Sequence, residues 1–401
     1  GIKARIREKL LTDCNLHTII RLPNSTFFPA TVSTNLLFFE KGNKTKDIWY
    51  YQHKLPEGQK TYSKTKPIPM EKVVAVVVTY NRLALLSECI TALRNQSRPL
   101  DGILVINNGS TDGTEEWLNA QPDVSYFTQK NIGGAGGFST AIKMGYEQGY
   151  EWIWCMDDDG MPKEDALENL LAAQPAELTL MNCAVIDNKD RKSFVWNTGG
   201  YKTLDDVPGN IIDGIGHPFN GTFINRRIIE RVGVPKASFF LWGDETEYYY
   251  RIVRRNKIPV CTVANSIHYH PATAFSVKKD WDYASGWKMY YYIRNRFHIH
   301  QTKFNNKALA LLHYSCFLLA FAGVTIVFQK TDRLKKLSFI MWPAADAINN
   351  NFEALPPVIL TRLKSAEPVS LSDSINSYLK TTWMNILAPF TSARTERAAN
   401  A

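Results

Sequence analysis

Between residues 73 and 157 the chain alternates short apolar runs with stretches of helical spacing. Positions 73–78 are six consecutive small apolar residues, five of them Val, which predicts a central strand covered on both faces. Further apolar runs predict strands over 103–106, 124–127 and 152–156. Helices are expected between the strands over 83–94, 114–119 and 139–148. Strands that alternate with helices at this spacing predict an α/β fold with a doubly wound, mostly parallel sheet.

The region ahead of this sheet has a different pattern. Runs rich in β-branched and aromatic residues predict strands over 16–22, 34–39 and 48–51. Pro67 and Pro69 mark a linker behind these strands. We therefore expect a small β-rich N-terminal segment over 1–70, followed by the sheet domain over 71–300.

The region behind the sheet domain, 301–401, is predicted to be helical. Positions 308–328 carry no formal charge, and their length could just span a bilayer. Polar residues such as His313 argue equally for a buried or interfacial helix, which we favour. Short amphipathic helices are expected beyond Pro356, and a disordered tail over 391–401.

Charge is unevenly distributed along the chain, whose net charge is +9. Lys and Arg outnumber Asp and Glu by 12 to 5 in residues 1–70 and by 11 to 6 in residues 300–401, whereas the middle holds 24 against 27. Basic flanks suit an anionic membrane surface or nucleic acid; the alternative is an ordinary solvated surface. The six cysteines include no CxxC pair, which argues against a zinc site and a disulfide framework. Residues 1–13 lack an apolar stretch, so we expect no secretory signal and a reducing cytosol.

Three consecutive carboxylates, Asp157, Asp158 and Asp159, end the fourth apolar run. Open α/β sheets bind their ligands at the carboxyl ends of the strands. Because alternate side chains of a strand share a face, Asp157 and Asp159 can point together while Asp158 points away. Two hard oxygen ligands aimed at one point suit Mg²⁺ or Mn²⁺ that carries a substrate's phosphates. The alternative is an acidic turn that caps a helix beginning near Pro162.

A second acidic cluster, Asp244, Glu245 and Glu247, follows the aromatic residues at 239–242. A carboxylate base beside an apolar sugar-binding wall is what an inverting sugar transferase needs. The alternative is an acidic helix start, where the helix dipole favours negative charge.

Four stretches in this order and spacing resemble the nucleotide-sugar domain of family 2 glycosyltransferases, which has the GT-A fold. They are VTYNR at 78–82, NNGSTDGT at 107–114, NIGGAGG at 131–137 and DDD at 157–159. The resemblance covers roughly residues 72–300 and implies that the first two stretches hold the nucleoside, while the Gly-rich loop approaches the sugar and the diphosphate. The donor-binding residues that it implies are Thr79, Asn81, Arg82, Asn107, Asn108, Asp112, Asn131, Gly133, Gly134 and Asp158. The family usually has Asp where Asn107 stands, and an amide there loses the charge but still hydrogen-bonds.

The same resemblance implies a metal site formed by Asp157, Asp159 and His270, the last of which follows an aromatic residue as in the family. A lone histidine is more often a core or surface residue than a ligand, so this assignment depends on the resemblance. His268 would share the face of His270 if the strand before them continued.

The resemblance also places the family's base carboxylate at Glu245, where Asp is commoner, with Asp244 as the second candidate. Trp242 and Glu247 are expected to bind the acceptor. The longer arm of Glu245 moves the carboxylate by one methylene, and this substitution, like Asn107, leaves a transferase fold without activity as an alternative.

The stretches 133–138 and 290–296 (YYYIRNR), with Asp280 and Trp281, resemble the galactofuranosyltransferase branch, and similar sequences occur in rhamnosyltransferases. The implied donors are UDP-galactofuranose and dTDP-rhamnose, and the implied acceptor is a lipid-linked cell-surface glycan. We expect a bacterial enzyme at the cytoplasmic face of the plasma membrane, with peripheral membrane contact and no nucleic-acid partner.

Residues 1–68 carry a second resemblance, to the end of the methyltransferase domain in type I restriction-modification modification subunits. The stretches that carry it are 6–11, 15–23, 34–39 and 62–67. The family's adenosylmethionine loop and its Asn-Pro-Pro-Tyr type motif occur nowhere in the chain, which implies a catalytically empty fragment. The alternative function is therefore a DNA-binding or inactive component related to such a subunit.

Overall fold

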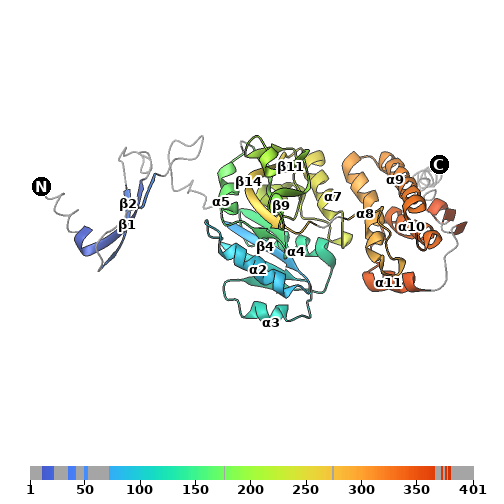
Figure 1. The fold of residues 1–401 in the computed structure, drawn as a ribbon, viewed down its shortest axis with the longest axis horizontal. Coiled ribbons are helices and arrows are strands. Elements are labelled where there is room, and N and C mark those ends of the chain that lie inside the picture. Colours follow the sequence, from blue (N-terminus) through green and yellow to red (C-terminus); the bar gives the residue numbers. More distant parts are fainter. Residues whose placement is uncertain are drawn as a thin grey trace, which may run out of the picture. The chain divides into compact units, whose positions relative to one another are not determined.

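The computed structural model describes residues 11–21, 35–41, 49–52, 72–175, 177–272, 275–365 and parts of 372–380 (Figure 1). The chain divides into two compact units, Gly1–Glu71 and Lys72–Ala401. In the first unit, β1 (Cys14–Arg21) pairs antiparallel with β2 (Asn35–Lys41) and parallel with β3 (Trp49–Gln52). Strands are thus present where the sequence predicts them, whereas the stretch 62–67 and the tail 391–401 lie outside the described residues.

The second unit is built on a mixed, mostly parallel sheet, which confirms the predicted fold class. Its parallel half has the order β7-β4-β5-β6. These strands are β4 (Val73–Thr79), β5 (Gly102–Asn107), β6 (Ser125–Thr128) and β7 (Trp152–Asp157). The helices between them are α2 (Leu83–Arg94), α3 (Thr114–Asn119) and α4 (Gly133–Glu147).

The other half of the sheet brings late segments of the chain beside β7. There β13 (Thr222–Asn225) lies antiparallel between β7 and β9 (Leu180–Asp187), and β14 (Val260–His270) runs parallel to β9. Two reversals make β14 run in the same direction as β7, so the carboxyl ends of both strands lie at one edge. The remaining elements are β8 (Met161–Pro162), β10 (Ser193–Thr198), β11 (Tyr201–Thr203), β12 (Ile211–Asp213), α5 (Ala166–Ala173), α6 (Arg226–Val232) and α7 (Asp244–Tyr250).

The two faces of β4 belong to different cores, which explains its unbroken apolar sequence. Val73, Ala75 and Val77 pack with α2 and α5, whereas the alternate residues of the strand pack with α4, α6 and α7. All seven residues of β4 are buried. A strand covered on both faces needs apolar side chains at every position, because each buried Val contributes up to about 1.5 kcal/mol.

The structure corrects one predicted helix start and excludes one alternative. Helix α4 begins at Gly133 rather than at residue 139, so the Gly-rich stretch forms the first turns of a helix and is no loop. The glycines permit close approach: a Cβ at Gly133 would lie 1.9 Å from the carbonyl oxygen of Phe240. A Cβ at Gly137 would lie 2.4 Å from Cγ1 of Val78. Pro162 lies in β8 and the next helix begins at Ala166, so the alternative of a helix that begins near Pro162 is wrong.

The chain after the sheet forms helices, as the sequence predicts. They are α8 (Trp287–Phe304), α9 (Lys307–Phe328), α10 (Arg333–Ile348) and α11 (Pro356–Lys364). Only one side of α9 is buried, through residues such as Tyr314 and Phe321, while Leu312 and Leu319 on the other side are 60% and 74% exposed. Helix α9 thus packs on the C-terminal core by one side only, and an interfacial or buried helix at 308–328 stays a prediction. Within the described residues, α9 is the one helix whose length and apolar composition would allow it to cross a membrane.

Candidate functional site

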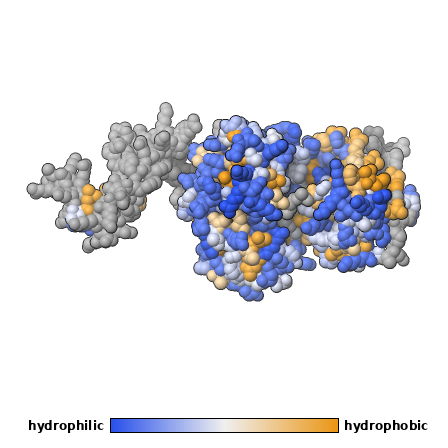
Figure 2. All heavy atoms as spheres, in the orientation of Figure 1, coloured by the Kyte–Doolittle hydropathy of each residue, from blue (hydrophilic) through white to orange (hydrophobic). Residues whose placement is uncertain are grey.

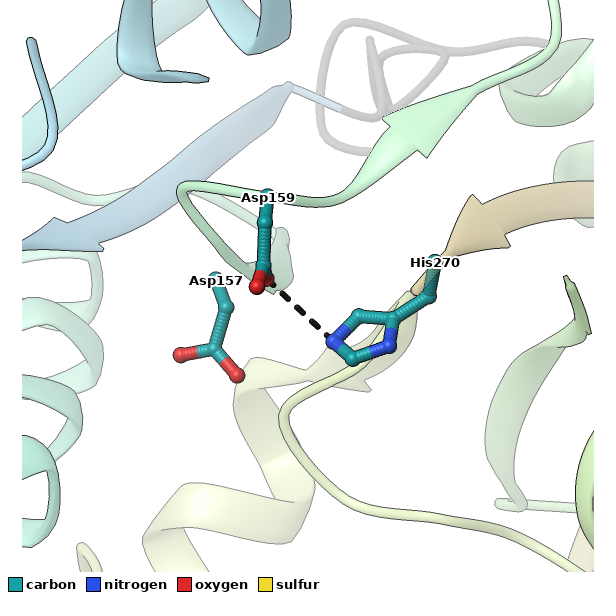
Figure 3. Close-up of side chains that lie close together, drawn as sticks. All are labelled: Asp157, Asp159 and His270. Atoms are coloured by element: carbon teal, nitrogen blue, oxygen red, sulfur yellow. Dashed lines mark ion pairs between the residues drawn. The ribbon is translucent and has the colours of Figure 1, made fainter. Parts of the chain in front are cut away.

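Asp157, Asp159 and His270 converge at the carboxyl edge of the sheet (Figure 3). Asp157 ends β7, Asp159 lies in the turn that follows, and His270 ends β14. One ligand atom from each of the three side chains lies within 4.8 Å of the other two. The neighbouring strand ends therefore assemble a possible site for a divalent cation from residues more than a hundred positions apart.

Electrostatics within this cluster suit a cation. Nε2 of His270 lies 3.2 Å from Oδ1 of Asp159, yet that buried oxygen has no well-aligned hydrogen-bond donor. Nδ1 of His270 lies 2.8 Å from the carbonyl oxygen of Pro271, which favours a proton on Nδ1 and leaves Nε2 free as a ligand. Burial, followed by the charges of Asp159 and Asp158, raises the pKa of Asp157 to about 7. Bringing a positive ion here would relieve that repulsion.

The pKa values of the His270–Asp159 pair move apart, as expected for an ion pair. Burial alone would lower the pKa of His270, but contact with Asp159 outweighs it and the pKa is raised. Burial likewise opposes ionisation of Asp159, but His270 and Arg82 together lower its pKa. In this state His270 carries a proton, and a metal ion bound to its imidazole would replace that proton.

Asp158 points away from the cluster, as the sequence predicts. Its Oδ2 accepts a hydrogen bond of 2.8 Å from Oγ1 of Thr79, and its Oδ1 lies 3.1 Å from Nη1 of Arg82. Arg82 also lies 3.1 Å from Oδ2 of Asp159, so one guanidinium bridges two of the three carboxylates. These contacts tie the end of β4 to the end of β7.

The predicted nucleoside loops meet beside this edge, but several of their side chains are engaged with the protein. Asn81 accepts from the amide of Thr111 at 2.7 Å, and Asn107 accepts from the amide of Ser110 at 2.9 Å. Asp112 accepts from the amide of Leu83 at 2.9 Å and so supports the start of α2. The structure thus gives these residues a role in shaping the two loops, and nucleoside contacts stay a prediction.

The Gly-rich helix start is linked to the same loops. Nδ2 of Asn108 donates to the carbonyl oxygen of Gly133 at 3.1 Å, and Oδ1 of Asn131 accepts from the amide of Gly133 at 2.9 Å. Gly134 faces open space, because a Cβ there would meet nothing within 4 Å. There is therefore space for a ligand beside Gly134, although the amides of Gly133 and Ala135 on either side of it are already hydrogen-bonded within the protein.

The second acidic cluster lies at the start of α7. Burial, together with the neighbouring charge of Glu245, raises the pKa of Asp244 well above its usual range, and Asp157 adds to the effect. Glu245 is half-buried, and its Oε2 accepts from the amide of Gly243 at 2.9 Å. The charge of Asp157 therefore reaches the acidic cluster at the start of α7, which follows it by more than eighty residues.

Glu247 has a different environment from its neighbours. It is 1% exposed, and its oxygens lie 3.0 Å from Lys236 and 3.0 Å from Arg251. Oγ1 of Thr302 donates to it at 2.8 Å. This buried network favours a structural role for Glu247, so we leave it out of the proposed acceptor site. Trp242, in contrast, is partly exposed, with its ring 4.7 Å from that of Phe275.

Trp196 lies beside the cluster of Asp157, Asp159 and His270, His217 lies beside Trp196, and neither belongs to any motif in the sequence. The ring of Trp196 lies 5.3 Å from the His270 ring and 5.4 Å from the His217 ring. Trp196 comes from β10 and has no motif signal of its own. His268 lies on β14 as expected but does not join the cluster: it is fully buried against Gly160, and burial lowers its pKa to about 3.

Comparison with known proteins shows that the N-terminal segment is similar to a family of its own. Residues 1–97 match the N-6 DNA Methylase family. The type I restriction enzyme EcoEI methylase subunit of Escherichia coli is 51% identical over 78 residues, which are 19% of this chain and 16% of that subunit. The similarity thus spans only a small part of the length of that subunit.

Comparison of the sheet domain gives a different family. Residues 74–232 match Glycosyl transferase family 2. The galactofuranosyltransferase GlfT1 of Mycolicibacterium smegmatis is 33% identical over 216 residues, which are 50% of this chain and 71% of that protein. A solved structure of S. aureus TarS is similar at a TM-score of 0.46 and 12% identity, covering 78% of this chain and 55% of that chain, a likeness too slight to bear on function. The family match and the relative together show that this chain belongs to glycosyl transferase family 2.

Proposed function

We propose that residues 72–300 catalyse a metal-dependent, inverting transfer of a sugar from a nucleotide diphosphate donor to a cell-surface glycan. The observation that carries this proposal is the convergence of Asp157, Asp159 and His270 beside the acidic start of α7. UDP-galactofuranose is the first candidate donor because the M. smegmatis relative is named a galactofuranosyltransferase, and dTDP-rhamnose is the second.

The donor set fits a hard divalent ion. The cluster offers two carboxylates and one imidazole nitrogen, which match the ligands of Mg²⁺ or Mn²⁺ better than those of a thiolate-binding metal. One of the carboxylate oxygens, Oδ1 of Asp159, is buried without an aligned hydrogen-bond donor. When bound, the ion supplies positive charge that stabilises the diphosphate leaving group. The chain itself adds Arg82, which already bridges Asp158 and Asp159, and the space beside Gly134 at the amino end of α4.

The acidic start of α7 supplies the base in this proposal. Glu245 takes the proton from an acceptor hydroxyl while that oxygen attacks the anomeric carbon, and the nucleoside diphosphate leaves from the opposite face. A single displacement of this kind inverts the configuration. The aromatic surface of Trp242 and Phe275 provides the apolar wall against which an acceptor sugar can pack.

Metal-dependent nucleotide binding is the first expected result, and it should depend on pH. Without metal, the pKa of Asp157 is raised to about 7 and the pKa of His270 is raised above its usual value by contact with Asp159, so metal binding at about pH 6 must release protons. Calorimetry should therefore show UDP binding with Mn²⁺ at about pH 8, at least about tenfold weaker binding at about pH 6, and little without metal. The titrations are repeated with dTDP to choose between the two donors.

The alternative function makes the opposite prediction for the same sample. A DNA-binding component would bind duplex DNA with an affinity that falls steeply with salt, and would bind neither nucleotide. That pair of results from folded protein would overturn the transferase proposal.

The membrane contact in this proposal involves α9. Figure 2 shows hydrophobic residues gathered on the surface of the C-terminal helices, where α9 exposes Leu312, Leu319 and Val327. Lys307 precedes these residues and Lys330 follows them. An apolar helix face with basic ends fits the surface of an anionic bilayer, where a lipid-linked acceptor would be found.

Replacing Leu319 by Glu should weaken binding to vesicles of anionic phospholipid at least about tenfold, because the change removes a large apolar side chain and adds repulsion. Co-sedimentation with such vesicles measures the effect. Leu319 is 74% exposed, so folding should be unaffected. The matched control is Val358→Glu on α11, which changes an apolar residue that is 57% exposed. Equal losses in both variants, or no loss in either, would contradict a specific role of α9.

A further inference from the structure

The loop that leads into the acidic cluster, residues 238–243, has an unusual backbone. Phe240 has φ 63° and ψ −60°, and Trp242 has φ 61°. Side chains with a Cβ rarely adopt positive φ, and such residues persist only where the surrounding structure holds them. The strained segment ends directly at Asp244, the first residue of α7. Some part of the protein must therefore hold this loop in place.

The side-chain amide of Asn295 on α8 holds the loop by its carbonyl groups. Its Nδ2 donates to the carbonyl oxygens of Phe239, Leu241 and Trp242 at 3.0, 3.1 and 2.7 Å. Asn295 is 1% exposed, so water does not compete for these bonds. One buried amide thus fixes three of the four residues between 239 and 242.

Arg294, the preceding residue on α8, holds the loop one step earlier. Its Nη2 donates to the carbonyl oxygens of Ser238 and Phe239 at 3.0 and 2.9 Å, and its Nε donates to Oδ1 of Asn295 at 3.0 Å. The last bond fixes which way the Asn295 amide faces. The two side chains therefore act as one unit.

The charge of Arg294 has no other evident purpose. The side chain is fully buried, and among the described residues no carboxylate forms an ion pair with it. Its guanidinium instead lies 4.9 Å from the Tyr291 ring and 4.8 Å from the Phe352 ring. Burying a cation is costly unless its donors are used: Nη2 is directed at the strained loop and Nε at Asn295, whereas Nη1 is buried without a hydrogen-bond partner.

The opposite side of the loop contacts the start of α4. The amide of Ala135 donates to the carbonyl oxygen of Phe240 at 3.2 Å, and the same oxygen leaves no room for a Cβ at Gly133. The loop is thus held between α8 and the helix start that faces the donor side of the site.

We propose that Arg294 and Asn295 are positioning residues for sugar transfer, which hold the strained loop 238–242 so that the carboxylates at the start of α7 face the reacting atoms. This inference rests on the proposed function and assigns a role to the RN pair of the YYYIRNR stretch. It also makes α8 part of the catalytic unit, although α8 contributes no group to the reaction.

The test combines steady-state kinetics with hydrogen–deuterium exchange of the full chain. Asn295→Ala should lower kcat about 100-fold, as expected for a displaced catalytic group, while KM for the donor stays within about threefold. Amides of 238–243 should exchange at least about tenfold faster, with exchange in β4 and β7 unchanged. Arg294→Lys keeps the charge but loses the planar fork of donors, and should give the same pattern with a smaller amplitude.

The matched control is Tyr314→Phe, which removes a buried hydrogen bond to α8 without touching the loop. Its hydroxyl donates to the carbonyl oxygen of Ile293 at 3.1 Å. Equal loss of kcat in this control, or unchanged exchange of 238–243 in both test variants, would overturn the inference. Failure of the proposed function is distinguishable, because wild-type protein would then transfer no sugar while the exchange measurement still reports on the loop.

Discussion

Replacing Asp159 by Asn should abolish metal-dependent nucleotide binding and lower sugar transfer at least about 1,000-fold, equivalent to about 4 kcal/mol. The amide keeps the shape of the side chain but removes a charged ligand from the three-residue cluster. It also removes the charged partner of His270. Burial alone would lower the pKa of His270, and contact with Asp159 raises it. Calorimetry with Mn²⁺ and UDP measures binding, and transfer of labelled sugar measures turnover.

A matched control for this change is Asp123→Asn. Asp123 forms an ion pair of 2.6 Å with Arg94 at the surface and does not belong to the cluster of Asp157, Asp159 and His270. An exposed pair of this kind contributes little, so the control should keep wild-type binding and turnover. Metal-dependent UDP binding that survives Asp159→Asn would show that the cluster does not hold the ion.

Replacing Glu245 by Gln should lower kcat by about 100-fold to 10,000-fold while leaving metal-dependent UDP binding intact. A base is needed only when the acceptor hydroxyl loses its proton, so donor binding should not depend on it. Single-turnover transfer at saturating donor measures the effect. The control is Glu230→Gln, which alters an exposed carboxylate paired with Arg226.

The variant Asp244→Asn separates the two candidate bases. Burial and the charge of Glu245 raise the pKa of Asp244 well above its usual range, which favours the protonated, neutral form of this carboxyl. Asn mimics a neutral carboxyl, and its effect on kcat should therefore stay within about tenfold. A large loss in Asp244→Asn with a mild effect in Glu245→Gln would assign the base to Asp244 instead.

The parallel half of the sheet could be predicted because each of its strands carries its own signal. Residues 73–78 are apolar at every position, and the strand is buried on both faces in the structure. The local sequence pattern therefore predicts the tertiary environment directly. The directions of the three carboxylates after β7 can also be predicted from local sequence. Alternation along the strand is enough to separate Asp158 from Asp157 and Asp159.

The start of α4 could not be predicted, because local propensity and tertiary packing disagree there. Four glycines in five residues disfavour a helix by about 1 kcal/mol each relative to Ala, and the sequence therefore indicates a loop. The carbonyl of Phe240 and the side chain of Val78, which make those glycines necessary, come from distant parts of the chain. No pattern within the stretch itself carries this information.

The surroundings of single polar residues could not be predicted from the sequence either. Glu247 belongs to the same short acidic stretch as Glu245, yet Lys236, Arg251 and Thr302 surround it and leave it buried. Trp196 reaches the His270 ring from a strand that has no recognisable motif. Spacing identifies which residue types are present, whereas their partners depend on how separate elements pack.

The contact between the start of α4 and the Phe240 carbonyl links the donor half of the site to the acidic half. We expect a ligand that binds the amino end of α4 to order the loop before Asp244 as well. The amide of Ala135 donates to the carbonyl oxygen of Phe240, and the same oxygen leaves no room for a Cβ at Gly133. Linkage is reciprocal, so an acceptor analogue that orders the loop must tighten nucleotide binding by the same factor. For the proposed transferase we therefore expect donor and acceptor to bind cooperatively, with the ternary complex favoured over either binary one.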